Sequence, residues 1–270
     1  MTDNHAVTEA VRDVGAVIHT AAILPPFSET NPELARKVNV DGTNNIIAAI
    51  ESVNPTAHLI FSSSVSVHGN QTTCADQPRR IDDPFNPSDQ YSRHKVECEG
   101  MLLKSSIRWT ILRISACVDE KSRMLSLDNI RDSLEIFLSV APKCRIEYIH
   151  PQDVATAMVN SINNEEAVGK RFFLGGGINC RSYWRDLNSI RLETFGLGKP
   201  PESCFGNQSF YTDWLDTDEA QRILNFQNHD LEDYRRELMT MFRWPRRLLS
   251  FVPSAAKDYS WKWLPLLIRR

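Results

Sequence analysis

Residues 58–66 have the sequence His58-Leu59-Ile60-Phe61-Ser62-Ser63-Ser64-Val65-Ser66, in which an apolar run passes directly into a cluster of serines. A short apolar run of this kind is typical of a strand that is buried on both faces of a parallel sheet. Similar runs occur before it, at Ala16–Ala22, and after it, at Trp109–Arg113. Helical patterns near residues 32–53 and 91–105 separate the three runs. This alternation predicts an α/β fold with a parallel sheet and right-handed crossovers.

The composition is that of an ordinary globular protein. Of the 270 residues, 41% are hydrophobic and 24% are charged, which argues against wholesale disorder and against a fibrous repeat. The net charge of -3 argues against a protein built to bind nucleic acid. No apolar run reaches the length of about 18 residues that a membrane-spanning helix needs, and the polar start does not resemble a signal peptide. Six cysteines without a Cys-x-x-Cys pair predict free thiols in a cytoplasmic protein and no metal site.

Tyr91 and Lys95 stand one helical turn apart, so they share one face of the predicted helix. A free phenol titrates near pH ~10, but a fixed positive charge beside it favours the phenolate and makes it a better base. The serine cluster follows a strand at its carboxyl end, the edge where open α/β sheets bind ligands. A hydroxyl there can donate to a carbonyl that gains negative charge. A Tyr-Lys spacing also arises by chance, and serines also populate ordinary loops.

Several motifs occur in a fixed order. They are His19-Thr20-Ala21-Ala22, Asn39-Val40-Asp41-Gly42-Thr43, the serine cluster, Tyr91-x-x-x-Lys95, Leu112-Arg113, Tyr148-Ile149-His150-Pro151-Gln152-Asp153-Val154-Ala155 and Asp216-Thr217-Asp218-Glu219-Ala220. Over most of the chain this series resembles extended short-chain dehydrogenases/reductases, which include NAD-dependent epimerase/dehydratases and 3β-hydroxysteroid dehydrogenase-like enzymes. The resemblance implies a doubly wound, Rossmann-like parallel sheet with a smaller C-terminal substrate lobe.

The resemblance also implies roles for particular residues. Tyr91 would be the general acid/base, and Lys95 would lower its pKa and hold the nicotinamide ribose. Ser64 would polarise the substrate carbonyl, with Ser63 as the alternative because one sequence does not fix the register of a serine triplet. Asn39 would support the site, although packing or capping would explain it equally well. The residues expected to line the cofactor, NAD or NADP, are Thr20, Ala21 and Ala22, together with Tyr91 and Lys95.

The implied activity is NAD(P)-dependent oxidoreduction or epimerisation of a secondary alcohol or ketone. The substrate classes left open are a nucleotide-sugar, a sterol-like alcohol and a small carbonyl compound. A rival hypothesis is a non-catalytic binding or scaffold protein that keeps the fold without binding a dinucleotide, and a third is one subunit of a hetero-complex. The resemblance further implies a homodimer formed through the helices near residues 32–54 and 91–105.

The sequence departs from the family pattern in three places. His68 replaces a common tyrosine, and Ile114-Ser115 follows Leu112-Arg113 where a proline is usual. The family opens with a strand and a Gly-x-x-Gly-x-x-Gly turn that binds the pyrophosphate, and this sequence contains no such turn. Three explanations stay open: an internal start within a longer enzyme, a second chain that supplies the segment, or a natural loss of dinucleotide binding. In each case the strand at Ala16–Thr20 is expected at the edge of the sheet.

We expect three regions along the chain. Residues 1–115 would form a partial dinucleotide-binding core, and residues 116–242 a substrate lobe interleaved with returning core elements. Residues 243–270 form a basic tail with seven Lys or Arg, one acidic residue and three tryptophans. Such a tail can lie on an anionic membrane surface. Three prolines interrupt it, however, which favours packing against its own domain or a partner subunit.

Overall fold

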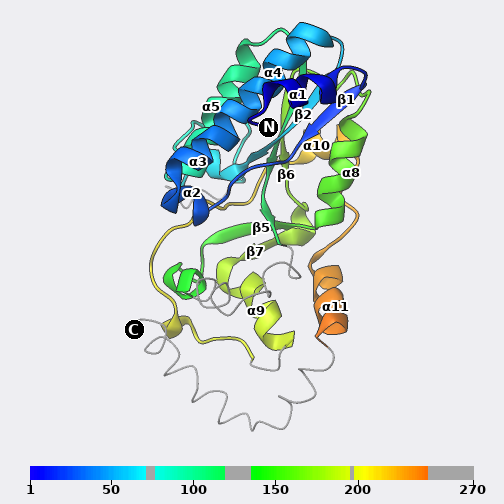
Figure 1. Cartoon of the computed structure of the whole chain (residues 1–270). Coiled ribbons are helices and arrows are strands. Elements are labelled where there is room, and N and C mark those ends of the chain that lie inside the picture. Colours follow the sequence, from blue (N-terminus) through cyan, green and yellow to red (C-terminus); the bar gives the residue numbers. More distant parts are fainter. Residues whose placement is uncertain (71–76, 119–134, 195–197, 243–270) are drawn as a thin grey trace. The chain divides into compact units, whose positions relative to one another are not determined.

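The computed structural model describes residues 1–70, 77–118, 135–194 and 198–242 (Figure 1). The chain forms two compact units and passes between them several times. The first contains Met1–Ser115, Gln152–Leu174 and Leu215–Phe226, and the second contains Ala116–Pro151, Gly175–Trp214 and the chain from Gln227 onward. The assignment of dinucleotide binding and substrate binding to separate regions remains a prediction. The predicted role of the tail at 243–270 lies outside the described residues.

The first unit is built on a four-stranded parallel sheet. The strands are ordered β1 (Ala16–His19), β2 (His58–Ser64), β3 (Arg108–Ile114) and β6 (Lys170–Leu174). Figure 1 shows helices α4 (Gly42–Val53) and α5 (Gln90–Lys104) on one face of the sheet and α8 (Pro151–Ser161) on the other. The helix α10 (Asp218–Leu224) belongs to the same unit. The prediction of a doubly wound parallel α/β sheet is therefore confirmed.

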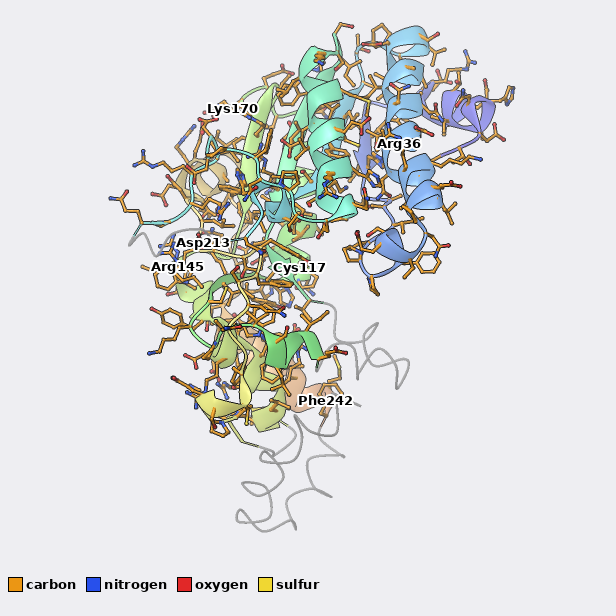
Figure 2. The ribbon with its side chains drawn as sticks, turned by 90° about the vertical axis from the view of Figure 1, so that its left-hand side faces the viewer. Arg36, Cys117, Arg145, Lys170, Asp213 and Phe242 are labelled. Carbon is orange, nitrogen blue, oxygen red and sulfur yellow. The ribbon has the colours of Figure 1, made fainter. Side chains whose placement is uncertain are left out.

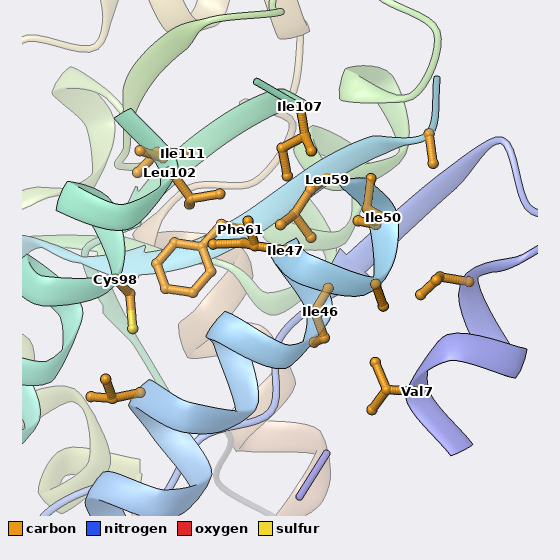
Figure 3. Close-up of a cluster of buried hydrophobic side chains, with 14 residues drawn as sticks. Val7, Ile46, Ile47, Ile50, Leu59, Phe61, Cys98, Leu102, Ile107 and Ile111 are labelled. Atoms are coloured by element: carbon orange, nitrogen blue, oxygen red, sulfur yellow. The ribbon is translucent and has the colours of Figure 1, made fainter. Parts of the chain in front are cut away.

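The core of the first unit lies between β2 and the helices on one face. Leu59 and Phe61 alternate along β2 and point to this face, where they meet Ile46, Ile47 and Ile50 of α4 (Figure 3). Residues of the short helix α1 (Asn4–Val11) join the same cluster. Full burial of one such side chain stabilises a fold by roughly 1.5–3 kcal/mol. The apolar runs of the sequence thus fix the position of β2 beneath α4 and α5.

β1 is the terminal strand of this sheet among the described residues. It ends at His19, where its pairing with Phe61 of β2 ends, rather than at Ala22. Only His19 is buried, whereas Ile18 is 40% exposed. The edge position was predicted. The expectation that this run is buried on both faces is wrong, because the covering helices reach an edge strand only in part.

The helix predicted over residues 32–53 is interrupted. It consists of α3 (Pro32–Arg36), one π-helical turn (Lys37–Asp41) and α4, and a short helix α2 (Phe27–Thr30) precedes it. The Asn39 carbonyl oxygen in the π turn accepts hydrogen bonds from Thr43 Oγ1 at 2.6 Å and from Cys98 Sγ at 3.2 Å. These side chains supply donors where the regular helix ladder is disrupted. Such π turns are frequent at functional sites.

The second unit contains a smaller sheet with the order β4 (Ala116–Cys117), β5 (Arg145–Ile149) and β7 (Arg181–Tyr183). β5 runs parallel to β4 and antiparallel to β7, and the helices α9 (Trp184–Thr194) and α11 (Leu231–Met241) belong to this unit. Arg145 forms an ion pair with Asp213 at 2.7 Å, and Figure 2 labels both residues. Within the described chain, no helix combines the length and apolar character needed to cross a membrane.

Candidate active site

The helix α5 begins at a capping box. Asp89 Oδ1 accepts a hydrogen bond from the Ser92 backbone N–H at 2.6 Å, and Ser92 Oγ accepts one from the Asp89 N–H at 3.2 Å. This cap sets the first turn of the helix and with it the direction of Tyr91. Tyr91, Lys95 and Glu99 follow one another at intervals of four residues, so they lie along one face of α5.

The ammonium group of Lys95 is buried at the end of β2. Its Nζ donates to the backbone carbonyl of Ser62 at 2.5 Å, and the residue is only 3% exposed. Nζ lies 4.6 Å from the centroid of the Phe61 ring and 5.5 Å from the centroid of the Tyr91 ring. Burial lowers the pKa of Lys95 to about 8, while Cys98 and Glu99 act in the opposite direction. At neutral pH the group therefore carries a positive charge beside the half-buried Tyr91.

The serines at the carboxyl end of β2 have different partners. Ser63 Oγ donates to Glu99 Oε1 at 2.5 Å in a buried contact, so its hydroxyl hydrogen is committed to the helix. Ser64 Oγ accepts from the Ser66 backbone N–H at 3.1 Å and caps the short 3₁₀ helix Val65–His68. A hydroxyl that accepts a hydrogen bond keeps its own hydrogen for donation. Ser64 therefore keeps a hydroxyl hydrogen for donation, whereas the hydrogen of Ser63 is used by Glu99.

Asn39 holds the loop that leaves β1. Its Oδ1 accepts from the Ile23 backbone N–H at 2.7 Å, and its Nδ2 donates to the Ile23 carbonyl at 2.9 Å. The three residues between β1 and Ile23 are the predicted cofactor-lining residues Thr20, Ala21 and Ala22, of which Thr20 and Ala21 are exposed. The amide therefore fixes the loop at the carboxyl end of β1, in keeping with a supporting role.

Sequence reasoning missed a buried polar network beside these residues. Glu99 and Arg113 are both fully buried, with Arg113 Nη2 2.7 Å and Nε 3.0 Å from the two oxygens of Glu99. Arg113 Nη1 also donates to the Ile81 carbonyl at 2.6 Å and lies 3.0 Å from His68 Nε2. The sequence offered one signal, since Glu99 follows Lys95 by one helical turn.

The side-chain types at this edge of the sheet can be compared with those of a metal centre. Among residues 1–70, 77–118, 135–194 and 198–242, no cluster of three or more His, Cys, Asp or Glu side chains could hold a metal ion. The polar side chains at the carboxyl ends of β1 and β2 include the His19 imidazole, the serine hydroxyls, the Lys95 ammonium and the Glu99 carboxylate. A parallel sheet with a Tyr-x-x-x-Lys helix against the serine-bearing end of a strand defines the short-chain dehydrogenase/reductase class.

Within this class, the chain belongs to the NAD dependent epimerase/dehydratase family, whose model matches residues 1–175. The resemblance inferred from the motifs is thus confirmed. Human 3 beta-hydroxysteroid dehydrogenase type 7 is 32% identical over 112 residues, which cover 42% of this chain and 28% of the relative. D-erythronate dehydrogenase of Cupriavidus necator is 25% identical over 185 residues, covering 63% of this chain and 55% of the relative. Bovine methionine adenosyltransferase 2 subunit beta is 30% identical over 127 residues, covering 46% and 36%.

Solved structures show the same fold. A short-chain dehydrogenase/reductase superfamily protein from Agrobacterium tumefaciens with bound NAD aligns with a TM-score of 0.74 and 18% identity, covering 92% of this chain and 85% of that one. UDP-glucose-4-epimerase from Stenotrophomonas maltophila, with bound NAD and formylated UDP-arabinopyranose, aligns with a TM-score of 0.70 and 21% identity, covering 93% and 82%. At these identities the likeness establishes the fold alone.

Proposed function

We propose that the chain is an NAD(P)-dependent oxidoreductase or epimerase that acts on a secondary alcohol or ketone, with Ser64, Tyr91 and Lys95 as its catalytic residues. The observation that carries this proposal is the buried Lys95 ammonium, which sits on the Ser62 carbonyl and 5.5 Å from the Tyr91 ring. A buried charge with a perturbed pKa at the ligand-binding edge of an α/β sheet is a frequent mark of an active site. Membership of the NAD dependent epimerase/dehydratase family supports the same reading.

The described residues fit the nicotinamide half of a dinucleotide. An ammonium group has three N–H donors, and the Ser62 carbonyl takes one from Lys95, which leaves this group suited to a ribose diol. The Asn39-held loop at Thr20–Ala22 would line the same half. The sequence has no Gly-x-x-Gly-x-x-Gly turn for the pyrophosphate. A nicotinamide bound beside Lys95 and the Thr20–Ala22 loop would supply hydride transfer to or from the substrate carbon.

Side chains of the protein would transfer the hydroxyl proton and stabilise the substrate oxygen. The positive charge of Lys95 stabilises the phenolate of Tyr91, so the phenol can take the hydroxyl proton of an alcohol or return a proton to a carbonyl oxygen. Ser64 donates a hydrogen bond to that oxygen as negative charge grows on it. The names of the relatives favour a hydroxysteroid-like or sugar-acid-like alcohol, and those of the structural neighbours favour a nucleotide-sugar. The substrate class is therefore proposed only as a secondary alcohol or ketone.

The first test is titration of the 270-residue chain with NADH and with NADPH, followed by fluorescence and calorimetry. We expect saturable binding of at least one of them. Turnover of a substrate panel should fall at least 100-fold in Tyr91→Phe and Lys95→Met. Tyr183→Phe and Lys104→Met, which change exposed residues of the same types, are the controls. Binding of neither cofactor by well-folded protein would refute the enzyme proposal for this chain.

A second candidate is a non-catalytic subunit or scaffold. It is favoured by the similarity to methionine adenosyltransferase 2 subunit beta, whose name describes a subunit. This candidate predicts that the chain is folded but binds neither NADH nor NADPH. It also predicts that Tyr91→Phe leaves the thermal midpoint and the oligomeric state of the chain unchanged.

A further inference from the structure

α5 is attached to β2 at two neighbouring points. Lys95 Nζ donates to the Ser62 carbonyl, and one helical turn later the Glu99 carboxylate accepts from the hydroxyl of Ser63, the next residue of β2. Both contacts measure 2.5 Å and both are buried. Lys95 and Glu99, four residues apart on α5, therefore contact residues that are neighbours in β2. Ser64, the proposed carbonyl-polarising residue, comes directly after the second point.

The second point of attachment is itself held by the adjacent strand. Arg113 of β3 is the direct register partner of Ser63, and its guanidinium binds both oxygens of Glu99. The third guanidinium nitrogen, Arg113 Nη1, donates to the Ile81 carbonyl and lies beside His68 Nε2. Three hydrogen bonds thus converge on the Glu99 carboxylate, two from Arg113 and one from Ser63. A carboxylate bound in this way has little freedom to move.

Stability alone is a poor explanation for this ion pair. Glu99 and Arg113 are both 0% exposed, and desolvation of two charges can cancel most of their mutual attraction. Apolar side chains of similar volume often stabilise a fold as well or better. What a buried, bidentate pair supplies, and an apolar pair does not, is a fixed direction and distance between the elements that carry it.

We propose that Glu99, held by Arg113, is a positioning residue that fixes α5 along β2 and so places Lys95 against the Ser62 carbonyl and beside the Tyr91 ring. This inference rests on the proposed function, which makes Lys95 and Tyr91 catalytic residues. Glu99 would touch neither substrate nor cofactor. It would act through Ser63, whose neighbours in β2 are Ser62, the acceptor of Lys95, and Ser64, the proposed carbonyl-polarising residue.

The test substitutes Glu99→Asp, which keeps the charge and shortens the arm by one methylene group. The readout is the titration of the Lys95 side chain by NMR in protein with ¹³C-labelled lysine, with the Lys95 signal assigned from its absence in Lys95→Arg. Wild-type Lys95 should titrate near pH 8. In Glu99→Asp we expect its midpoint to move by about half a pH unit or more. Loosening of α5 lets water reach Nζ, which raises the pKa, while withdrawal of the Glu99 carboxylate weakens a charge that raises it in the wild type.

The matched control is Glu97→Asp. Glu97 lies on the same helix and forms a two-bond pair with Arg36 at 2.7 and 2.8 Å, but both side chains are about half exposed. This variant should leave the Lys95 titration unchanged. Ser63→Ala is the second variant, because it removes only the link to β2 and leaves the Glu99–Arg113 pair in place. It should raise the Lys95 midpoint, because water gains access to Nζ while the Glu99 charge stays in place. This variant also provides the test if Glu99→Asp does not fold.

Folded Glu99→Asp and Ser63→Ala proteins whose Lys95 titrates as in the wild type would overturn the proposal. Where the wild type shows turnover, Glu99→Asp should lower kcat at least tenfold while the Kd for NADH stays within about twofold. A loss of thermal stability with unchanged kcat would also overturn it. The lysine titration needs neither cofactor nor substrate, so a wild type that binds no nicotinamide would refute the proposed function without deciding this inference.

Discussion

His19 and His68 are held neutral inside the first unit by different neighbours. His19 lies 3.0 Å from Thr43 Oγ1, and burial, followed by the charge of Lys95, lowers its pKa to about 4. His68 lies against Arg113, and burial, followed by that guanidinium, lowers its pKa to about 4 as well. His68 Nδ1 lies 3.2 Å from the Pro84 carbonyl, which leaves Nε2 to accept from Arg113. The histidine that replaces a family tyrosine is thus part of the Arg113 network.

These histidines predict that acid destabilises the first unit. Their pKa values are about 4 when folded and about 6.5 when unfolded, so between these pH values the unfolded chain binds more protons. The stability is full above pH ~6.5 and falls as the pH drops toward ~4, by up to roughly 3 kcal/mol for each histidine. His19→Gln should make this fall shallower in urea unfolding at a series of pH values, and the exposed His5→Gln should not. An equal pH slope in all three proteins would contradict the prediction.

Single residues of the site were predictable to different degrees. Tyr91 and Lys95 could be named because a spacing of four on a helix brings side chains together whatever the fold. The choice between Ser63 and Ser64 could not be made, since it depends on which face of β2 meets α5. Glu99 and Arg113 were missed as a pair, because their contact joins the helix α5 to the strand β3 and leaves no local pattern in the sequence.

Among the elements, α5 has a clearly defined start. Asp89 supplies the N-cap, and its carboxylate is bonded to the N–H of Ser92 at 2.6 Å. Asp89→Ala removes that acceptor and should lower the free energy of unfolding by about 1 kcal/mol, within a range of roughly 0.5–2. Asp89→Asn keeps an oxygen at the same place and should cost far less. Chemical unfolding of the three proteins measures the difference, and equal losses in both variants would show that the hydrogen bond to the Ser92 N–H does not account for the stabilisation.

The elements also show which parts of the fold a sequence pattern predicts and which it does not. The runs at β2 and β3 predicted strands well because both are buried by helices. The π turn at Lys37–Asp41 was not predicted, and the contacts of Thr43 and Cys98 with the Asn39 carbonyl inside it leave no periodic pattern in the sequence. In the second unit, β4, β5 and β7 contain two to five residues each, which is too short for a period to emerge.

At the scale of the whole molecule, the predicted homodimer is open to a direct test. The helices named for its interface, near residues 32–54 and 91–105, carry Leu34 on α3 and Leu103 on α5, and each is 48% exposed. Exposed leucines on helices that contact one another are available to a second copy of the chain. They are also compatible with a monomer, because single apolar side chains are common on protein surfaces.

Substitution of Leu34 or Leu103 by lysine distinguishes a dimer from a monomer. In a dimer, Leu34→Lys or Leu103→Lys would place a charge without a partner in the interface and should weaken association at least tenfold. Val159→Lys is the matched control, because Val159 of α8 is 58% exposed and lies outside the named helices. Sedimentation velocity over a range of concentrations should show a wild-type dimer that Val159→Lys retains and that the leucine variants lose. A wild type that sediments as a monomer throughout, or leucine variants that remain dimeric, would exclude this interface and leave Leu34 and Leu103 as ordinary surface residues.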